Sequence, residues 1–267
     1  MSDQNSPIGV FDSGLGGLTV VRALRHLVPD ESIIYFGDTA RVPYGSKSAA
    51  TVTRFSQQIV DFLLTKNVKL IVVACNTVSS LALPILRTRN TIPMTGVIDP
   101  GAEAATKATR SNHIGVIGTT ATINSNAYVD ALKAIDPNLA VVSIACPLFV
   151  PLVEEGWTDG PVAKMVSDDY LKPFWADTVD TVILGCTHYL ILRDTIRTSL
   201  PENVRLVDSA EAVSEEVKRE LYTQGIAARG GDGRLTCFVT DLPQKFEELG
   251  ERFLGTPLPD VTLVRLD

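Results

Sequence analysis

Short apolar segments rich in Val and Ile recur along the whole chain, separated by longer segments with helical periodicity. The apolar segments lack alternating polar residues, which indicates strands covered on both faces, as in parallel sheets. Between two of them, at 48–66, apolar side chains repeat at intervals of three and four residues and predict an amphipathic helix. Ten strands are expected, at 7–11, 32–37, 69–75, 94–98, 113–118, 140–146, 181–186, 204–208, 235–240 and 261–266.

The alternation of strands and helices predicts βαβ units and a doubly wound α/β fold. Three sequence motifs also recur in the same order at an offset of about 110 residues, which indicates two similar halves. The matching positions are Ile8 with Ile114, Cys75 with Cys186, and Asp99 with Asp208.

The repeat predicts two similar flavodoxin-like domains of parallel sheet, related by pseudo-twofold symmetry, with the active site between them. The residues after Asp208 contain no third cysteine motif, so we expect them to return to the sheet of the first half. The first domain would then comprise 1–98 and 209–267, and the second 99–208. Asp99 and Asp208 would lie at the crossovers and are hinge candidates.

The composition is that of an ordinary globular protein, with 267 residues, 45% hydrophobic and 21% charged. A net charge of −7 argues against general binding to nucleic acid or to an anionic membrane. No apolar run is long enough to span a membrane, and the polar start of the chain does not resemble a secretory signal. Four cysteines without a CxxC pair indicate reduced thiols, so we expect a cytoplasmic protein.

Two of the cysteines stand where strands end. Ligands of open parallel sheets bind beyond the carboxyl ends of the strands. Cys75 is followed there by Asn-Thr and Cys186 by Thr-His, so each thiol has polar neighbours. We expect a helix N-terminus to lower the pKa of both thiols and make them bases beside a carboxylate-binding site. Cys146 and Cys237 have apolar neighbours and are interpreted as structural.

Other chemistry fits the same residues. Cys75, Cys186 and His188 could form a zinc site, although the spacing lacks the clustered ligands of zinc motifs. Cys186 could instead be a covalent nucleophile with His188 as its base, which leaves Cys75 without a role. The two cysteines could also form a reversible disulfide. As a further alternative, the chain could be a non-catalytic amino-acid-binding protein with two lobes.

Polar residues at the other strand ends complete the candidate site. Asp12 in "FDSGLGG" could assist a nearby base, and Ser13 could donate a hydrogen bond to a substrate carboxylate. Tyr44 and Gly45 follow the next strand, and Glu154 is a candidate carboxylate partner for His188. The glycine-rich segment matches no phosphate-loop pattern, so nucleotide binding is not expected.

Together, "FDSGLGGLTV", "ARVPYGSKS", "ACNT", "CPLFVPLVEEG" and "GCTHY" resemble the glutamate racemase family of the aspartate/glutamate racemase superfamily. The resemblance extends from Ile8 to about Val213. It implies interconversion of L- and D-glutamate without cofactor or metal, supplying D-glutamate for peptidoglycan. Aspartate is the nearest competing substrate.

The resemblance also implies roles for individual residues. Cys75 would deprotonate D-glutamate, and Cys186 would deprotonate L-glutamate. Asp12 would assist Cys75, while His188, oriented by Glu154, would assist Cys186. The only expected partners are the small-molecule substrate and a second copy of the chain in a homodimer. The residues expected to bind the amino acid are Asp12, Ser13, Tyr44, Gly45, Asn76, Thr77, Thr187 and His188.

Overall fold

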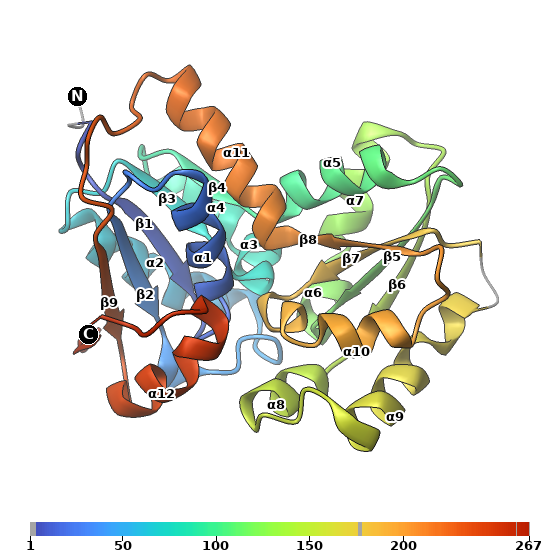
Figure 1. Cartoon of the computed structure of the whole chain (residues 1–267). Coiled ribbons are helices and arrows are strands. Elements are labelled where there is room, and N and C mark those ends of the chain that lie inside the picture. The colour runs from blue at the N-terminus through green and yellow to red at the C-terminus, as the bar shows by residue number, and fades with distance from the viewer. Residues whose placement is uncertain (1–3, 176–177, 260, 267) are drawn as a thin grey trace.

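The computed structural model describes residues 4–175, 178–259 and 261–266 and has the α/β fold expected from the sequence, with two parallel sheets. Figure 1 shows the two sheets side by side, each with helices on both faces. All ten expected strands form. They are β1 (Ile8–Asp12), β2 (Ile33–Gly37), β3 (Leu70–Val73), β4 (Met94–Gly96), β5 (His113–Gly118), β6 (Ala140–Ala145), β7 (Thr181–Gly185), β8 (Arg205–Asp208), β9 (Leu235–Val239) and β10 (Val261–Leu263).

The strand orders repeat between the sheets. The larger sheet has the order β10-β9-β2-β1-β3-β4, and the smaller has the order β6-β5-β7-β8. The run β2-β1-β3-β4 therefore matches β6-β5-β7-β8 strand for strand, and every pairing is parallel. The order 2-1-3-4 is that of flavodoxin-like folds, which confirms that the two halves are similar doubly wound units.

Helices connect and cover the strands. The α-helices are α1 (Leu18–Leu27), α2 (Ala49–Leu64), α3 (Asn76–Leu81), α4 (Leu83–Arg89), α5 (Ile98–Ala108), α6 (Thr120–Asn124), α7 (Ala127–Ile135), α8 (Phe149–Glu154), α9 (Gly160–Leu171), α10 (Arg193–Thr198), α11 (Ser209–Thr223) and α12 (Pro243–Leu254). Three short 3-10 segments are η1 (Thr39–Arg41), η2 (Lys172–Trp175) and η3 (Thr187–Leu190).

Strand β1 explains why the apolar segments do not alternate with polar residues. Val10 packs in the cluster on the α1 and α11 side of the sheet, whereas the adjacent Phe11 packs in the cluster that includes α2. The amphipathic helix predicted at 48–66 is α2, whose first turn is capped by the Ser48 side chain. Its buried residues Val52 and Ile59 face Phe11, so both sides of the strand are covered.

The C-terminal part of the chain joins the larger sheet. Strand β9 pairs with β2, and β10 pairs with β9. Helix α12, which connects β9 to β10 along the chain, packs against α1 (Figure 1). The boundaries of the two domains remain a prediction. Among the described residues, no helix is both long and apolar enough to cross a membrane.

Candidate active site

Cys75 stands just beyond the carboxyl end of β3. It is the residue before α3, and its side chain is 6% exposed. Its Sγ lies 3.7 Å from the hydroxyl of Ser13, which follows β1. Because β1 and β3 are adjacent parallel strands, their ends bring these two polar side chains together.

Cys186 occupies the equivalent place in the other half. It follows β7, precedes the 3-10 turn η3, and is 7% exposed. The turns from the two halves meet, since Thr187 donates a hydrogen bond of 3.5 Å to the Asp12 carboxylate. Charge on Cys75 also contributes to raising the pKa of Cys186, so the two thiols are within electrostatic range of one another. The structure thus brings both predicted thiols to one site between the sheets.

The expectation that helix N-termini lower the pKa of these thiols is wrong. Burial, and after it the nearby Asp12 carboxylate, raise the pKa of Cys75 to about 12. Burial also raises the pKa of Cys186. The backbone N–H groups of the following turns act in the opposite direction, but α3 has six residues and η3 four, and desolvation is the larger effect.

Asp12 is a buried carboxylate at the centre of the site. Its Oδ1 accepts a hydrogen bond of 2.9 Å from the Gly14 N–H, and its Oδ2 accepts the one from Thr187. Burial raises the pKa of Asp12, while the nearby His188 acts against that rise. No basic side chain forms an ion pair with Asp12 among those the structure describes. Burial without a basic partner therefore disfavours the charged form of this carboxylate.

The raised pKa of Asp12 predicts that its charge destabilises the folded protein. The protonated Asp12 carboxyl favours the folded protein. This contribution to the free energy of unfolding is complete below the unfolded pKa near 3.8 and is lost as pH rises through the higher folded pKa. Asp12→Asn keeps an oxygen for Gly14 and removes the charge. Urea unfolding should therefore show a more stable variant at pH 8, with the difference in the free energy of unfolding narrowing towards pH 4.

Asp38 supplies the matched control, because it is also buried but is paired with Arg41. Asp38→Asn should lower the free energy of unfolding at pH 8 by about 1–3 kcal/mol, since it weakens the acceptors for its partners. A loss of stability in Asp12→Asn equal to that in Asp38→Asn would contradict the prediction.

His188 and Glu154 form the pair that the sequence suggested. His188 lies in η3 and is buried, and its Nε2 is 3.2 Å from Oε1 of Glu154 at the end of α8. The other ring nitrogen faces the turn after β1, because a Cβ built on Gly16 would lie 2.7 Å from Nδ1. The imidazole is therefore held between segments from both halves.

The next residues along α3 face the second half. Asn76 is buried, and its side-chain carbonyl accepts a hydrogen bond of 2.7 Å from the Tyr128 hydroxyl. Its Nδ2 has no hydrogen-bond partner among the described residues. A buried amide donor without a partner is a good candidate for binding a substrate carboxylate.

Thr119 and Thr122, which the motifs do not single out, also belong to this region. Thr77 lies 3.0 Å from the Thr119 hydroxyl and 3.3 Å from the Thr122 hydroxyl. Both threonines follow β5, the counterpart of β1, so the repeat that aligns Ile8 with Ile114 contains a signal for them. These hydroxyls link the ends of β3 and β5 across the site.

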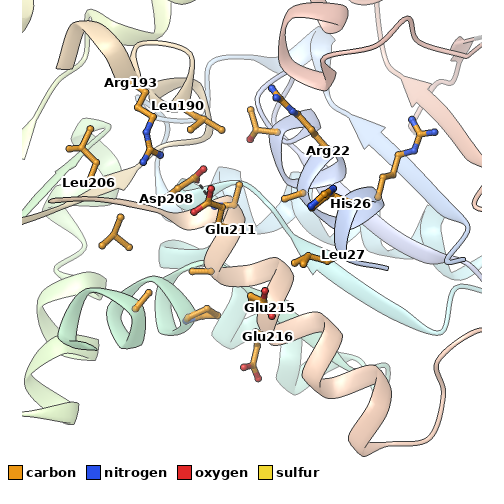
Figure 2. A pocket seen from close by; sticks show the side chains of 18 of the residues that line it. Arg22, His26, Leu27, Leu190, Arg193, Leu206, Asp208, Glu211, Glu215 and Glu216 are labelled. Atoms are coloured by element: carbon orange, nitrogen blue, oxygen red, sulfur yellow. Dashed lines mark hydrogen bonds between the residues drawn. The ribbon is translucent and has the colours of Figure 1, made fainter. Parts of the chain in front are cut away.

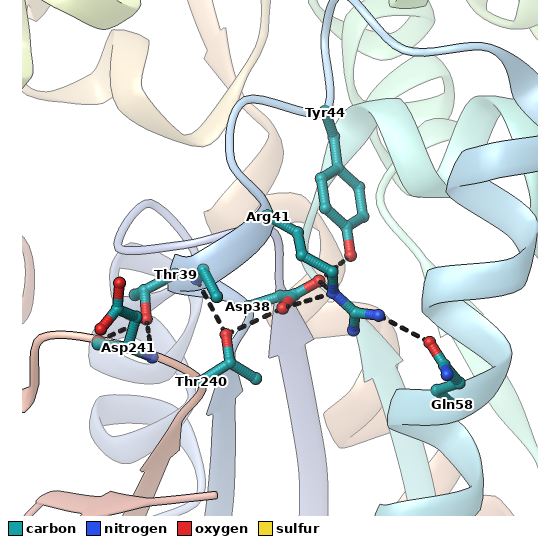
Figure 3. A network of polar contacts seen from close by, with 8 residues as sticks. Asp38, Thr39, Arg41, Tyr44, Gln58, Thr240 and Asp241 are labelled. Atoms are coloured by element: carbon teal, nitrogen blue, oxygen red, sulfur yellow. Dashed lines mark hydrogen bonds and ion pairs between the residues drawn. The ribbon is translucent and has the colours of Figure 1, made fainter. Parts of the chain in front are cut away.

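The loop after β2 is fixed by a polar network (Figure 3). The buried Asp38 accepts hydrogen bonds from Arg41, Tyr44 and Thr240, the last of which follows β9. The Tyr44 hydroxyl is thus engaged by protein, and its role with substrate stays a prediction. Gly45 contacts the other half, where its carbonyl accepts a hydrogen bond of 3.1 Å from Ala121.

The remaining cysteines are structural, as expected. Cys146 and Cys237 are fully buried, and all four cysteines are free, so Cys75 and Cys186 form no disulfide. Across 4–175, 178–259 and 261–266, no three His, Cys, Asp or Glu side chains are grouped so as to hold a metal ion. The zinc alternative therefore has no complete ligand set in this part of the chain.

A separate cavity of about 1520 Å³ lies among α1, α5, α11 and the start of α10. Figure 2 shows charged side chains of both signs around it, including Arg22 and Arg193 with Asp208 and Glu211. None of the predicted site residues lines this cavity.

With this geometry established, similarity to known proteins identifies the class. Residues 16–217 match the Asp/Glu/Hydantoin racemase family, and the chain belongs to that family. It is an isomerase that racemises amino acids. Within the family it is similar to the glutamate racemase of Chlorobaculum tepidum, with 50% identity over 97% of this chain and 96% of the relative.

Solved structures agree. The glutamate racemase of Francisella tularensis, in complex with D-glutamate, has a TM-score of 0.94 and 41% identity, covering 99% of both chains. That of Thermus thermophilus, in complex with beta-chloro-D-alanine, has a TM-score of 0.90 and 49% identity, covering 99% of this chain and 98% of the other.

Proposed function

We propose that this protein interconverts L- and D-glutamate by proton transfer at the α-carbon, without a cofactor. The observation that carries the proposal is the pair of buried thiols, Cys75 and Cys186, at equivalent strand ends of two similar halves. Inversion of a stereocentre by proton transfer needs a base on one face of the carbon and an acid on the other. Two matched thiols that exchange these roles meet that need in both directions.

In the D-to-L direction, the Cys75 thiolate takes the α-proton, which breaks the C–H bond and forms an S–H bond. The resulting carbanion then takes the proton of the Cys186 thiol on the opposite face. Cys75 ends as a thiol and Cys186 as a thiolate, so the reverse reaction begins with Cys186 as the base. Asp12 exchanges a proton with Cys75, and His188, oriented by Glu154, does the same for Cys186.

The raised thiol pKa values suit this chemistry. Because its pKa is raised to about 12, only a very small fraction of Cys75 is ionised at pH 7 before substrate binds. The thiolate that does form is a strong base, as a weakly acidic C–H bond requires. The positive ammonium group of an amino acid in the site would stabilise the thiolate and increase that fraction.

Neutral hydrogen-bond donors around the thiols bind the two carboxylates of glutamate. The free Nδ2 of Asn76 supports a role for this residue in holding a carboxylate. The same role is assigned to the hydroxyls of Ser13, Thr77 and Thr187, with Tyr44 and Gly45 shaping the adjacent loop. Stabilisation of the carbanion by such fixed donors supplies much of the rate acceleration.

We also propose the location, oligomeric state and biological role of the enzyme from the family to which it belongs. It acts in the cytoplasm as a homodimer and supplies D-glutamate for peptidoglycan. The two halves act as domains of 1–98 plus 209–267 and 99–208, which meet at hinges near Asp99 and Asp208.

A racemisation assay with L-glutamate and L-aspartate tests the proposal, with the enantiomers separated by chiral chromatography. The purified enzyme, dialysed against a chelator and given no cofactor, should convert glutamate with much the higher kcat/KM. One methylene in an apolar pocket changes binding by only about 1–3 kcal/mol, but a misplaced distal carboxylate also leaves its donors unpaired. Similar kcat/KM values for the two acids would contradict the substrate assignment.

A further inference from the structure

Helix α12 belongs to the C-terminal part of the chain, yet it contacts the predicted acid/base groups of the other half. The rings of Phe253 and His188 form a T-shaped pair, with 5.3 Å between ring centres and an angle of 78° between planes. Phe253 is 2% exposed and His188 is 5% exposed, so the contact is closed to water. Of the described residues, Phe253 is the aromatic partner of this imidazole.

The same helix reaches the segment that carries Glu154. A Cβ built on Gly156, two residues beyond Glu154, would lie 2.7 Å from the guanidinium of Arg252. Figure 1 shows α12 below α1. Consecutive residues of α12, Arg252 and Phe253, therefore lie against the turn after Glu154 and against His188.

We propose that Phe253 is a positioning residue for His188, an inference that rests on the proposed function. A histidine ring turns easily about its terminal side-chain bond, because rotation there has broad minima. The hydrogen bond to Glu154 fixes one nitrogen but does not by itself stop the ring plane from rocking about that bond. The Phe253 ring, nearly perpendicular to the imidazole, blocks this motion and keeps Nε2 directed at Glu154. The C-terminal helix of one half thereby governs proton transfer at Cys186 of the other.

The test compares Phe253→Leu with Phe246→Leu. Both residues lie in α12 and are 2% exposed, but Phe246 contacts the Tyr35 ring and not His188. Phe253→Leu should lower kcat/KM about tenfold through misalignment of the acid/base groups. Because mirror-image substrates have equal energies, kcat/KM must fall equally in both directions. Steady-state rates alone thus cannot tell which proton transfer has slowed.

Kinetic isotope effects with α-deuterated substrates separate the two transfers. If His188 has been loosened, removal of the proton by Cys186 becomes the slowest step. The isotope effect on kcat/KM should then rise for L-glutamate and fall for D-glutamate. Phe246→Leu should not raise the isotope effect for L-glutamate relative to that for D-glutamate. Phe253→Tyr, which keeps the ring, should show the two isotope effects of the wild-type enzyme. Isotope effects in Phe253→Leu that match those of Phe246→Leu would overturn the proposal.

A second measurement does not depend on activity. The chain has three histidines, so ¹⁵N-histidine labelling gives a simple spectrum in which His188 is assigned by its loss in His188→Asn. Phe253→Leu should move the His188 nitrogen signals towards those of Glu154→Gln, and Phe246→Leu should leave them in place. If Phe253→Leu does not fold, Phe253→Met replaces it in both experiments. An unchanged spectrum would overturn the positioning role, whereas inactive wild-type enzyme would overturn the proposed function instead.

Discussion

Cys75→Ala and Cys186→Ala should each lower the racemisation of glutamate by at least about 1000-fold in both directions. Each direction needs one thiol as base and the other as acid, so the loss of either removes both reactions. The measurement is the initial rate from each pure enantiomer. Cys237→Ala is the matched control, because Cys237 is also buried but lies within β9, away from the strand ends. It should retain most of the activity.

Heavy water gives an independent outcome for the same mechanism. The hydrogen removed by one thiol differs from the hydrogen returned by the other, which has exchanged with solvent. Early D-glutamate formed from L-glutamate should therefore carry deuterium at the α-carbon, while unreacted L-glutamate remains protiated. Deuterium in both enantiomers from the start would indicate a single base, as would a Cys75→Ala or Cys186→Ala variant with nearly wild-type turnover.

The fold was largely predictable because the hydrophobic pattern reports burial directly. Strands covered on both faces, such as β1 with Val10 and Phe11, have no polar alternation and are easily separated from helices such as α2. The ends of β1, β3 and β7 were recognisable for the same reason, since the first polar residues follow a continuous apolar run. That rule located Asp12, Cys75 and Cys186 before any contact between the halves was known.

The electrostatics of the site could not be predicted in this way. The sequence places each thiol before a helix or turn, which alone would lower its pKa. The pKa of Cys75 instead depends on burial and on Asp12, which is 63 positions away along the chain and adjacent only after folding. The contact between Phe253 and His188 was equally hidden, because it joins the C-terminal helix of one half to the other half.

Gly16→Ala should reduce activity more than any other single methyl group added at the turn after β1. A Cβ on Gly16 would lie 2.0 Å from Oγ1 of Thr187 and 2.7 Å from Nδ1 of His188, well inside contact distance. The turn that carries Thr187 and His188 must therefore move away from the turn after β1. Such a shift of catalytic groups should lower kcat about 100-fold, and the overpacking should cost about 1–3 kcal/mol of stability.

Gly9→Ala separates the two effects of Gly16→Ala. Gly9 lies in the middle of β1, where an added Cβ would approach only the aliphatic side chains of Leu63 and Val68, at 3.3 Å. It should therefore lower the urea midpoint while kcat remains within a few-fold of wild type. Gly16→Ala should lower kcat far more for the same loss of stability, because the atoms that must move are those proposed to bind substrate and transfer protons. Equal kcat values in the two variants would show that the contact between Gly16 and the Thr187–His188 turn has no part in catalysis.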